Sequence, residues 1–168
     1  NQVTAHVLGV VGNEWQLLGT GDLNGNGTSD MLLQRTSDHM LARYTIDNDQ
    51  ITSSALLGPI GGDWHVLAFG DFNGDGTDDV LTQRDGDHLL NVYTFQNSQI
   101  TAATSLGQIG SEWHVLDAGD FNNDGTSDLL WQRESDHMLL MQQVNGNQIG
   151  ASASLMRATI AARACRYA

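Results

Sequence analysis

The sequence repeats itself every 49 residues, and this repeat constrains the fold more than any other feature of the chain. Three units align without gaps: residues 11–59, 60–108 and 109–157. Self-similarity at a period of roughly 20–50 residues indicates a repeat architecture, in which neighbouring units share their cores. We therefore predict three whole repeats. Residues 1–10 are expected to form the terminal strand of a partial unit, and residues 158–168 a tail outside the repeat.

Each repeat contains four short apolar or alternating runs, separated by clusters of Gly, Asn, Asp and Ser. In the third repeat the runs are 112–119, 127–133, 137–144 and 147–155. Such runs favour β-strands, and no window carries the sustained 3.6-residue period of a helix. Four strands in about 45–50 residues is the size of one β-propeller blade. The predicted fold is all-β: three four-stranded blades and one extra N-terminal strand.

One tryptophan recurs in each repeat, at Trp15, Trp64 and Trp113. A bulky ring at one fixed place per blade can fill the gap between neighbouring sheets, so we interpret the three residues as structural.

Three blades are too few to close a ring by themselves. An open arc would expose two apolar blade faces, which need a cover. We expect that the ring is completed either by sequence outside these residues or by other copies of the chain, and the homo-oligomer is the favoured interpretation. Residues 1–10 could then add as an outer strand to a blade of another copy, and head-to-tail addition without closure would give a filament.

The charge of the chain narrows its possible partners. Its net charge is −13, with 7 basic residues, all of them Arg. Nucleic acid and anionic membrane surfaces both bind positive patches, so neither is expected as a partner. No apolar run approaches the length of a membrane span, so membrane insertion is not expected either. The single cysteine, Cys165, excludes an internal disulfide framework and a cysteine-based zinc site.

Each repeat also carries a nine-residue loop rich in Asp and Asn. Positions 1, 3, 5 and 9 of the loop offer side-chain oxygen, position 6 is Gly, and the Thr at position 7 can turn its backbone carbonyl inward. Hard oxygen ligands alone suit Ca²⁺ better than transition metals, and Mg²⁺ prefers to keep its waters. The predicted ligands are Asp22, Asn24, Asn26, Thr28, Asp30, Asp71, Asn73, Asp75, Thr77, Asp79, Asp120, Asn122, Asp124, Thr126 and Asp128.

A hairpin turn without metal is the alternative interpretation of such a loop. Three copies with carboxylates in register disfavour it, because uncompensated carboxylates repel one another. The second and third loops bring three Asp each, whereas Asn26 replaces the middle carboxylate of the first loop. Calcium affinity follows ligand charge, so we expect about three Ca²⁺ per chain, with the first site weakest and with calcium stabilising the blades.

The segment FGDFNGDG at 69–76, with its D-x-N-x-D-G-x-x-D spacing and its blade-sized period, resembles the FG-GAP/VCBS-type repeats. Such repeats occur in the β-propeller of integrin α-subunits, in some fungal lectins and in many secreted bacterial proteins. The resemblance implies a calcium-bearing propeller, secreted or at the cell surface, that acts in adhesion or binds glycans or extracellular proteins. Two features depart from the family: the three blades, against about six or seven, and an Asp-His pair in each repeat.

The Asp-His pair follows a Gln-Arg pair at the second turn of each repeat. One interpretation is turn chemistry, since Asp is a natural turn residue. The other is a ligand site in each blade that binds sugar hydroxyls or carboxylates. The candidate ligand residues are Arg35, Asp38, His39, Arg84, Asp87, His88, Arg133, Asp136 and His137.

Catalysis finds no support in the sequence. It contains no nucleophile elbow, no metalloprotease helix and no phosphate loop. Repeat symmetry also argues against an active site, which needs unlike groups brought together. We therefore expect a non-catalytic extracellular binding module. A structural self-assembling subunit, or an accessory domain of a secreted enzyme, remains the alternative.

Overall fold

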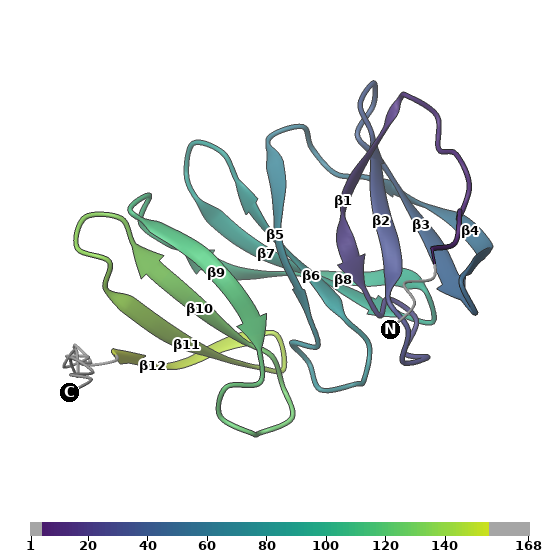
Figure 1. Cartoon of the computed structure of the whole chain (residues 1–168). Helices are drawn as coiled ribbons and strands as arrows, with labels where there is room; N and C mark the ends of the chain where they lie inside the picture. Colours follow the sequence, from purple (N-terminus) through teal and green to yellow (C-terminus); the bar gives the residue numbers. More distant parts are fainter. Residues whose placement is uncertain (1–4, 155–168) are drawn as a thin grey trace, which may run out of the picture.

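The computed structural model describes residues 5–154, which form three four-stranded antiparallel sheets (Figure 1). Sheet 1 contains β1 (Trp15–Gly21), β2 (Asp30–Arg35), β3 (Met40–Asp47) and β4 (Gln50–Pro59). Sheet 2 contains β5 (Trp64–Gly70), β6 (Asp79–Arg84), β7 (Leu89–Gln96) and β8 (Gln99–Gln108). Sheet 3 contains β9 (Trp113–Gly119), β10 (Asp128–Arg133), β11 (Leu139–Asn145) and β12 (Gln148–Ser154).

Every sheet is a meander in which consecutive strands pair, and the predicted all-β fold with four strands per repeat is confirmed. The same irregularity recurs in the first pair of each sheet, where the register shifts by one residue near the middle of the strand. Among residues 5–154 there is no helix, and hence none that could cross a membrane.

The second strand of each sheet reads as a continuous apolar run because both of its faces are buried. In β6, Val80 belongs to one core cluster and Leu81 to the other, and the two side chains are 2% and 0% exposed. Successive side chains of a strand point to opposite faces, so sheet 2 contributes to both cores. This double burial explains why alternation is weak in β2, β6 and β10.

Two apolar cores hold the three sheets together. The core between sheets 1 and 2 contains Leu23, Leu32, Leu41, Ile60, Val80 and Phe95. The core between sheets 2 and 3 contains Phe72, Leu81, Leu90, Val92, Leu129, Trp131 and Val144. Two of the three recurring tryptophans lie at these junctions: Trp64 packs against the first core and Trp113 against the second, as expected of structural residues.

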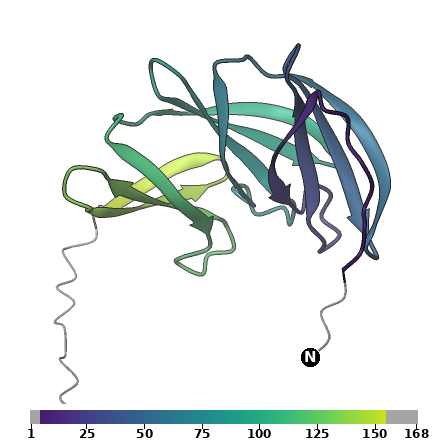
Figure 2. The same cartoon turned by 45° about the horizontal axis from the view of Figure 1, so that its top comes forward.

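The sheets are arranged as an open fan, with sheet 2 between sheets 1 and 3 (Figure 2). Their first strands lie next to one another, with β1 against β5 and β5 against β9. The described residues therefore form blade-like units, but they do not close a ring.

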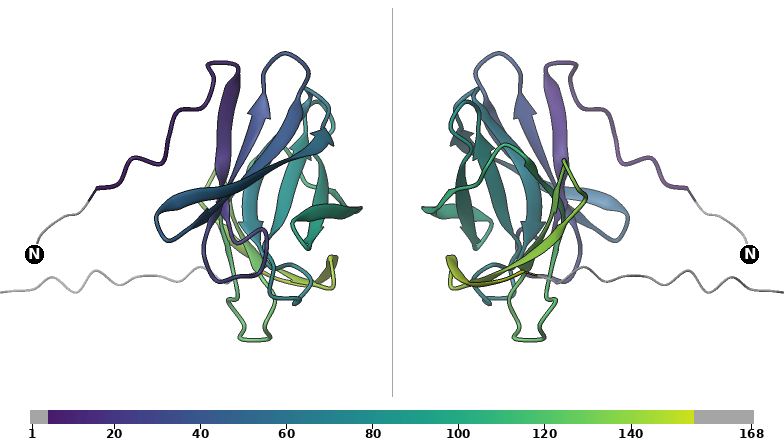
Figure 3. Two further views of the ribbon diagram at one scale, coloured as in Figure 1. Left: turned by 90° about the vertical axis from the view of Figure 1, so that its right-hand side faces the viewer. Right: turned by 90° about the vertical axis from the view of Figure 1, so that its left-hand side faces the viewer.

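Within the described part of the predicted N-terminal strand, residues 5–10, no strand is formed. Residues 5–12 carry no strand, and the segment runs outward from the sheets (Figure 3). Two of its apolar side chains find no partner surface, as Val7 and Val10 are 93% and 98% exposed. Residues 1–4 and the predicted tail at 158–168, with Cys165, lie outside the described residues.

Candidate metal-binding loops

The three Asp/Asn loops connect the first and second strands of each sheet, at one common end of the fan. In each loop the chain wraps around its first carboxylate. Asp71 accepts hydrogen bonds from the backbone N–H groups of Gly74 and Asp75 at Oδ1 (2.7 and 3.1 Å) and from Gly76 at Oδ2 (2.8 Å). Asp22 accepts the same three bonds in the first loop, and Asp120 accepts the two from Asp124 and Gly125 in the third.

Positions 3 and 5 continue this wrapping. The Asn73 side-chain oxygen accepts from the Asp75 N–H (2.8 Å), and Asp75 Oδ1 accepts from the Thr77 N–H (2.9 Å). The counterparts one period away make the same bonds in both other loops. Side chains that bond to backbone two residues ahead favour tight turns over strand pairing, so the loop geometry follows directly from the Asp/Asn spacing.

The Asp at position 9 is the most buried of the predicted ligands in each loop. Asp30, Asp79 and Asp128 are all 0% exposed. Through Oδ1, each accepts a backbone N–H from the end of the third strand: Ile46 (3.2 Å), Phe95 (3.0 Å) and Val144 (3.2 Å), respectively. Position 9 therefore ties the loop to the body of its sheet.

The second oxygen of this carboxylate distinguishes the three loops. The Oδ2 atoms of Asp79 and Asp128 are buried and have no hydrogen-bond partner. Burial raises the pKa of both carboxyls, that of Asp79 to about 7, and the negative charges of neighbouring loop carboxylates add to the effect. A buried carboxylate oxygen without a partner is costly unless a cation or donor faces it.

In the first loop that oxygen has partners. Asp30 Oδ2 accepts a hydrogen bond from the Asn24 side-chain amide (2.7 Å) and lies 3.6 Å from Nη1 of Arg43, which is itself only 5% exposed. Burial still raises the pKa of Asp30, while the Ile46 N–H and the Arg43 charge oppose the rise. The counterparts of Arg43 one and two periods on are Val92 and Met141. The sequence analysis missed Arg43, although this break in the repeat marks it.

The oxygen-rich donor set of the second and third loops fits a hard cation such as Ca²⁺. The fit rests on the partnerless Oδ2 atoms of Asp79 and Asp128, beside the carboxylates at positions 1 and 5. Within residues 5–154, no three His, Cys, Asp or Glu side chains are grouped as a metal site. Amide and backbone oxygens, which EF-hand-type loops also use, would therefore have to complete the ligand set.

Neighbouring loops are bonded to one another across the sheet junctions. The Asp78 N–H donates to the Asp22 carbonyl (2.8 Å), and Asp78 Oδ2 accepts the Asp22 N–H (2.8 Å). The Ser127 N–H donates likewise to the Asp71 carbonyl (2.7 Å). The three loops thus form one continuous strip along the fan.

At the opposite end of each sheet, the Arg and Asp of the predicted ligand residues are bonded to each other. Arg84 donates to both carboxylate oxygens of Asp87 (3.0 and 2.5 Å), and its guanidinium lies 5.4 Å from the centre of the Trp64 ring. Sheets 1 and 3 repeat this arrangement with Arg35, Asp38 and Trp15, and with Arg133, Asp136 and Trp113. The hydrogen bond from Arg84 lowers the pKa of Asp87 to about 2.

The histidine of each pair ends the turn. His39, His88 and His137 all have positive φ, between 54° and 58°, a conformation in which His is enriched among non-glycine residues. The His39 N–H donates to the Arg35 carbonyl (2.9 Å), and its own carbonyl accepts the Ile60 N–H (3.1 Å) at the entry to the next sheet. The Asp-His pairs therefore have a turn-forming role, as one of the two interpretations predicts.

A hollow of about 360 Å³ lies between sheets 1 and 2 at this end of the fan. Its polar lining comes from Gln16 and Gln34 of sheet 1, His39 of the turn, and His65 of sheet 2, with Trp64 beside them. The Gln34 Nε2 atom is buried without a hydrogen-bond partner. Of the predicted ligand residues, only His39 contributes to this hollow.

One family model matches part of the chain. Residues 22–82 match the FG-GAP-like repeat family, which confirms the resemblance carried by the loops. The match runs from the first loop through the second loop into β6, and so includes both the loop motif and the junction between sheets 1 and 2. No curated protein and no solved structure matches the chain.

Proposed function

We propose that this chain is a calcium-binding β-propeller repeat module that acts by binding, without catalysis, outside the cell or at its surface. The buried, partnerless carboxylate oxygens of Asp79 and Asp128, at the same place in the second and third loops, carry the proposal, and the second loop lies within the FG-GAP-like match. Calcium modules outside cells work at dissociation constants of about 10⁻⁴–10⁻³ M, a range that suits open loops with two or three carboxylates.

The role of calcium would be to stiffen the loop strip. A bound cation supplies the positive charge that the buried carboxylates lack. The stiffening would extend from the loop to the sheets, because position 9 is bonded to its own sheet and position 1 to the loop of the next sheet. Ion binding to the folded state alone stabilises it by linkage.

Calorimetric titration of chelator-stripped protein with Ca²⁺ tests the proposal. We expect about three binding events per chain, the first loop being weakest because Arg43 already neutralises Asp30, together with a rise in melting temperature. Asp79→Asn and Asp128→Asn should each weaken one of the tighter events by at least about tenfold, in line with the dependence of affinity on ligand charge. Wild-type protein that neither binds nor gains stability would refute the proposal.

Arg43→Met gives a matched test of the ranking, since Met141 occupies this position in the third repeat. Removing the guanidinium leaves Asp30 free of its competing cation, so affinity at the first loop should rise towards that of the other two. Unchanged affinity would show that the missing carboxylate at Asn26 alone determines the ranking.

The hollow between sheets 1 and 2 is the best-supported place for a small polar ligand, and we propose a carbohydrate. Amide and imidazole groups of Gln16, Gln34 and His39 offer hydrogen bonds to hydroxyls, next to the apolar surface of Trp64. Gln34→Ala should abolish binding on a glycan array while Ser37→Ala, at the exposed tip of the adjacent turn, should not. Equal binding by both variants, or no binding by wild type, would contradict a carbohydrate site here.

A further inference from the structure

Each inner junction of the fan joins two defined surfaces. We define the forward face of a sheet as the one that packs on the following sheet, and the backward face as the one that packs on the preceding sheet. The forward face of sheet 1 contains Leu18, Leu23, Leu32 and Leu41, and that of sheet 2 contains the counterparts Leu67, Phe72, Leu81 and Leu90. The two junctions are therefore built from equivalent residues, one period apart.

The forward face of sheet 3 has the same apolar residues, but none of the described sheets covers it. Leu116, Phe121 and Leu139 are 51%, 46% and 39% exposed. The counterparts of Phe121 and Leu139 in sheets 1 and 2 are at most 2% exposed. The counterparts of Leu116 in these sheets pack against the inner cores. The repeat thus preserves an interface surface at a place where the described residues leave it open.

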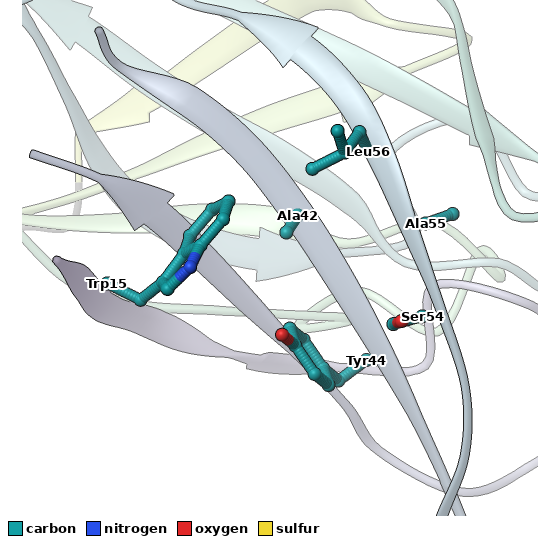
Figure 4. A pocket seen from close by; sticks show the side chains of 6 residues that line it. All are labelled: Trp15, Ala42, Tyr44, Ser54, Ala55 and Leu56. Atoms are coloured by element: carbon teal, nitrogen blue, oxygen red, sulfur yellow. The ribbon is translucent and has the colours of Figure 1, made fainter. Parts of the chain in front are cut away.

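The backward face of sheet 1 is the complementary open surface. Leu17 is 53% exposed, whereas its counterparts Val66 and Val115 pack into the two inner junctions. Beside it, Trp15, Ala42, Tyr44 and Leu56 border a shallow hollow of about 130 Å³ (Figure 4). Tyr93, the counterpart of Tyr44, packs against the core between sheets 1 and 2.

The backbone shows the same pattern. A Cβ atom at Gly21 would lie 2.9 Å from Asp78 Oδ2, and one at Gly70 would lie 2.7 Å from Ser127 Oγ, because the next sheet presses on both glycines. Gly119, the third in this series, would meet nothing closer than Phe121 at 3.9 Å. The absence of a side chain at Gly119 leaves room for a neighbour that the described residues do not supply.

We propose that a second copy of this chain covers both open faces, with the backward face of its sheet 1 docked on the forward face of sheet 3. Each copy carries the two halves of one interface at opposite ends, so two copies make the contact twice and close a ring of six sheets. Six sheets lie within the range of about 4–8 blades over which propellers close. Ser29 would then stand where Asp78 and Ser127 stand, with its N–H directed to the Asp120 carbonyl. This assembly goes beyond the binding function proposed above.

The mass of the full chain in solution, with Ca²⁺ present, tests the docking. Light scattering after size exclusion should give about twice the 18.2 kDa of one chain. Leu116→Asp and Leu17→Asp, each at an exposed position, should reduce the mass to that of one chain, because every interface of a pair then contains one buried charge. Ala102→Asp, on the exposed surface of β8, is the control and should remain paired.

Mixing the two monomeric variants distinguishes head-to-tail docking from any face-to-face contact. A Leu116→Asp chain keeps a normal backward face and a Leu17→Asp chain a normal forward face, so the mixture regains one intact interface and should form pairs. A monomeric wild type, single variants that remain paired, or a mixture that stays monomeric would each overturn the proposal. Circular dichroism spectra of both variants that match the wild type would exclude loss of fold as the cause. Gly119→Leu is a third variant that should block the interface.

Discussion

A single side chain outside the loop separates the first candidate site from the other two. Asp30, Asp79 and Asp128 have the same position, the same full burial and the same backbone bond, yet only Asp30 faces a guanidinium. Charge counting within the loops predicts a weak first site from Asn26 alone. Arg43 adds a second physical reason, since a fixed internal cation competes with a bound one for the same oxygen.

The raised pKa of Asp79 predicts an unusual pH dependence of stability for calcium-free protein. Its carboxyl titrates near 3.8 in the unfolded chain but near 7 in the folded one, so the unfolded state loses its proton first as pH rises. Stability should therefore fall between about pH 4 and pH 7, by at most about 4 kcal/mol. The burial that raises the pKa of Asp128 acts in the same direction.

Urea denaturation of chelated protein between pH 4.5 and 7.5 measures this slope. Asp79→Asn has no titrating group at this position, so the pH dependence of its stability should be much flatter. The variant therefore serves as the control for the wild type. A wild-type stability that is constant or rises over this interval would contradict the assignment of Asp79 as a buried, uncompensated acid.

At the level of elements, the strands and loops could be predicted from the sequence because their signals are local. Apolar runs bounded by Gly and Asp mark β5 to β8, and the Asp/Asn spacing marks the loop between β5 and β6. The engagement of Arg84 with Asp87 and Trp64 could not be predicted with the same certainty. It depends on a turn that ends in a residue of positive φ, and the modest enrichment of His in that conformation does not by itself predict it at His88.

The strand expected at residues 1–10 stays a prediction, since residues 5–10 form no strand with the three described sheets. A strand needs a partner edge, and an alternating sequence such as residues 1–10 shows only that a segment could pair, not that an edge lies within reach. The sequence also could not show which residues line the hollow between sheets 1 and 2, because Gln34 and His65 belong to different repeats.

The glycines that end β5 and β9 allow a matched prediction about the junctions. Gly70→Ala should destabilise the fold by about 1–3 kcal/mol, since its methyl group would overlap with Ser127. Gly119→Ala, at the same place in the next repeat, should change stability by less than about 0.5 kcal/mol. Chemical denaturation in the Leu116→Asp background, where the chain is expected to be monomeric, compares the two. Equal effects would show that the junction packing is not what restricts Gly70.

At the level of the whole molecule, stability should be distributed unevenly. Sheet 2 is packed on both faces, whereas each outer sheet is packed on one. In repeat proteins, stability is roughly a sum over units and nearest-neighbour interfaces, so the central unit opens least often. Hydrogen exchange of the monomeric variant should be slowest in β5 to β7 and faster in β2 and β10. Uniform exchange across the three sheets would show that the fan opens only as one cooperative unit.

The meander of each sheet also determines how the chain would respond to a pull on its ends. With four antiparallel strands in sequential order, the first strand starts and the fourth strand finishes at the same end of the sheet. Tension applied there loads the edge ladders one hydrogen bond at a time, as in opening a zipper, and not all together in shear. Each sheet that opens would lengthen the chain by roughly 150 Å, at about 3.4 Å per residue. A protein built from such units would act as an extensible tether that yields in steps.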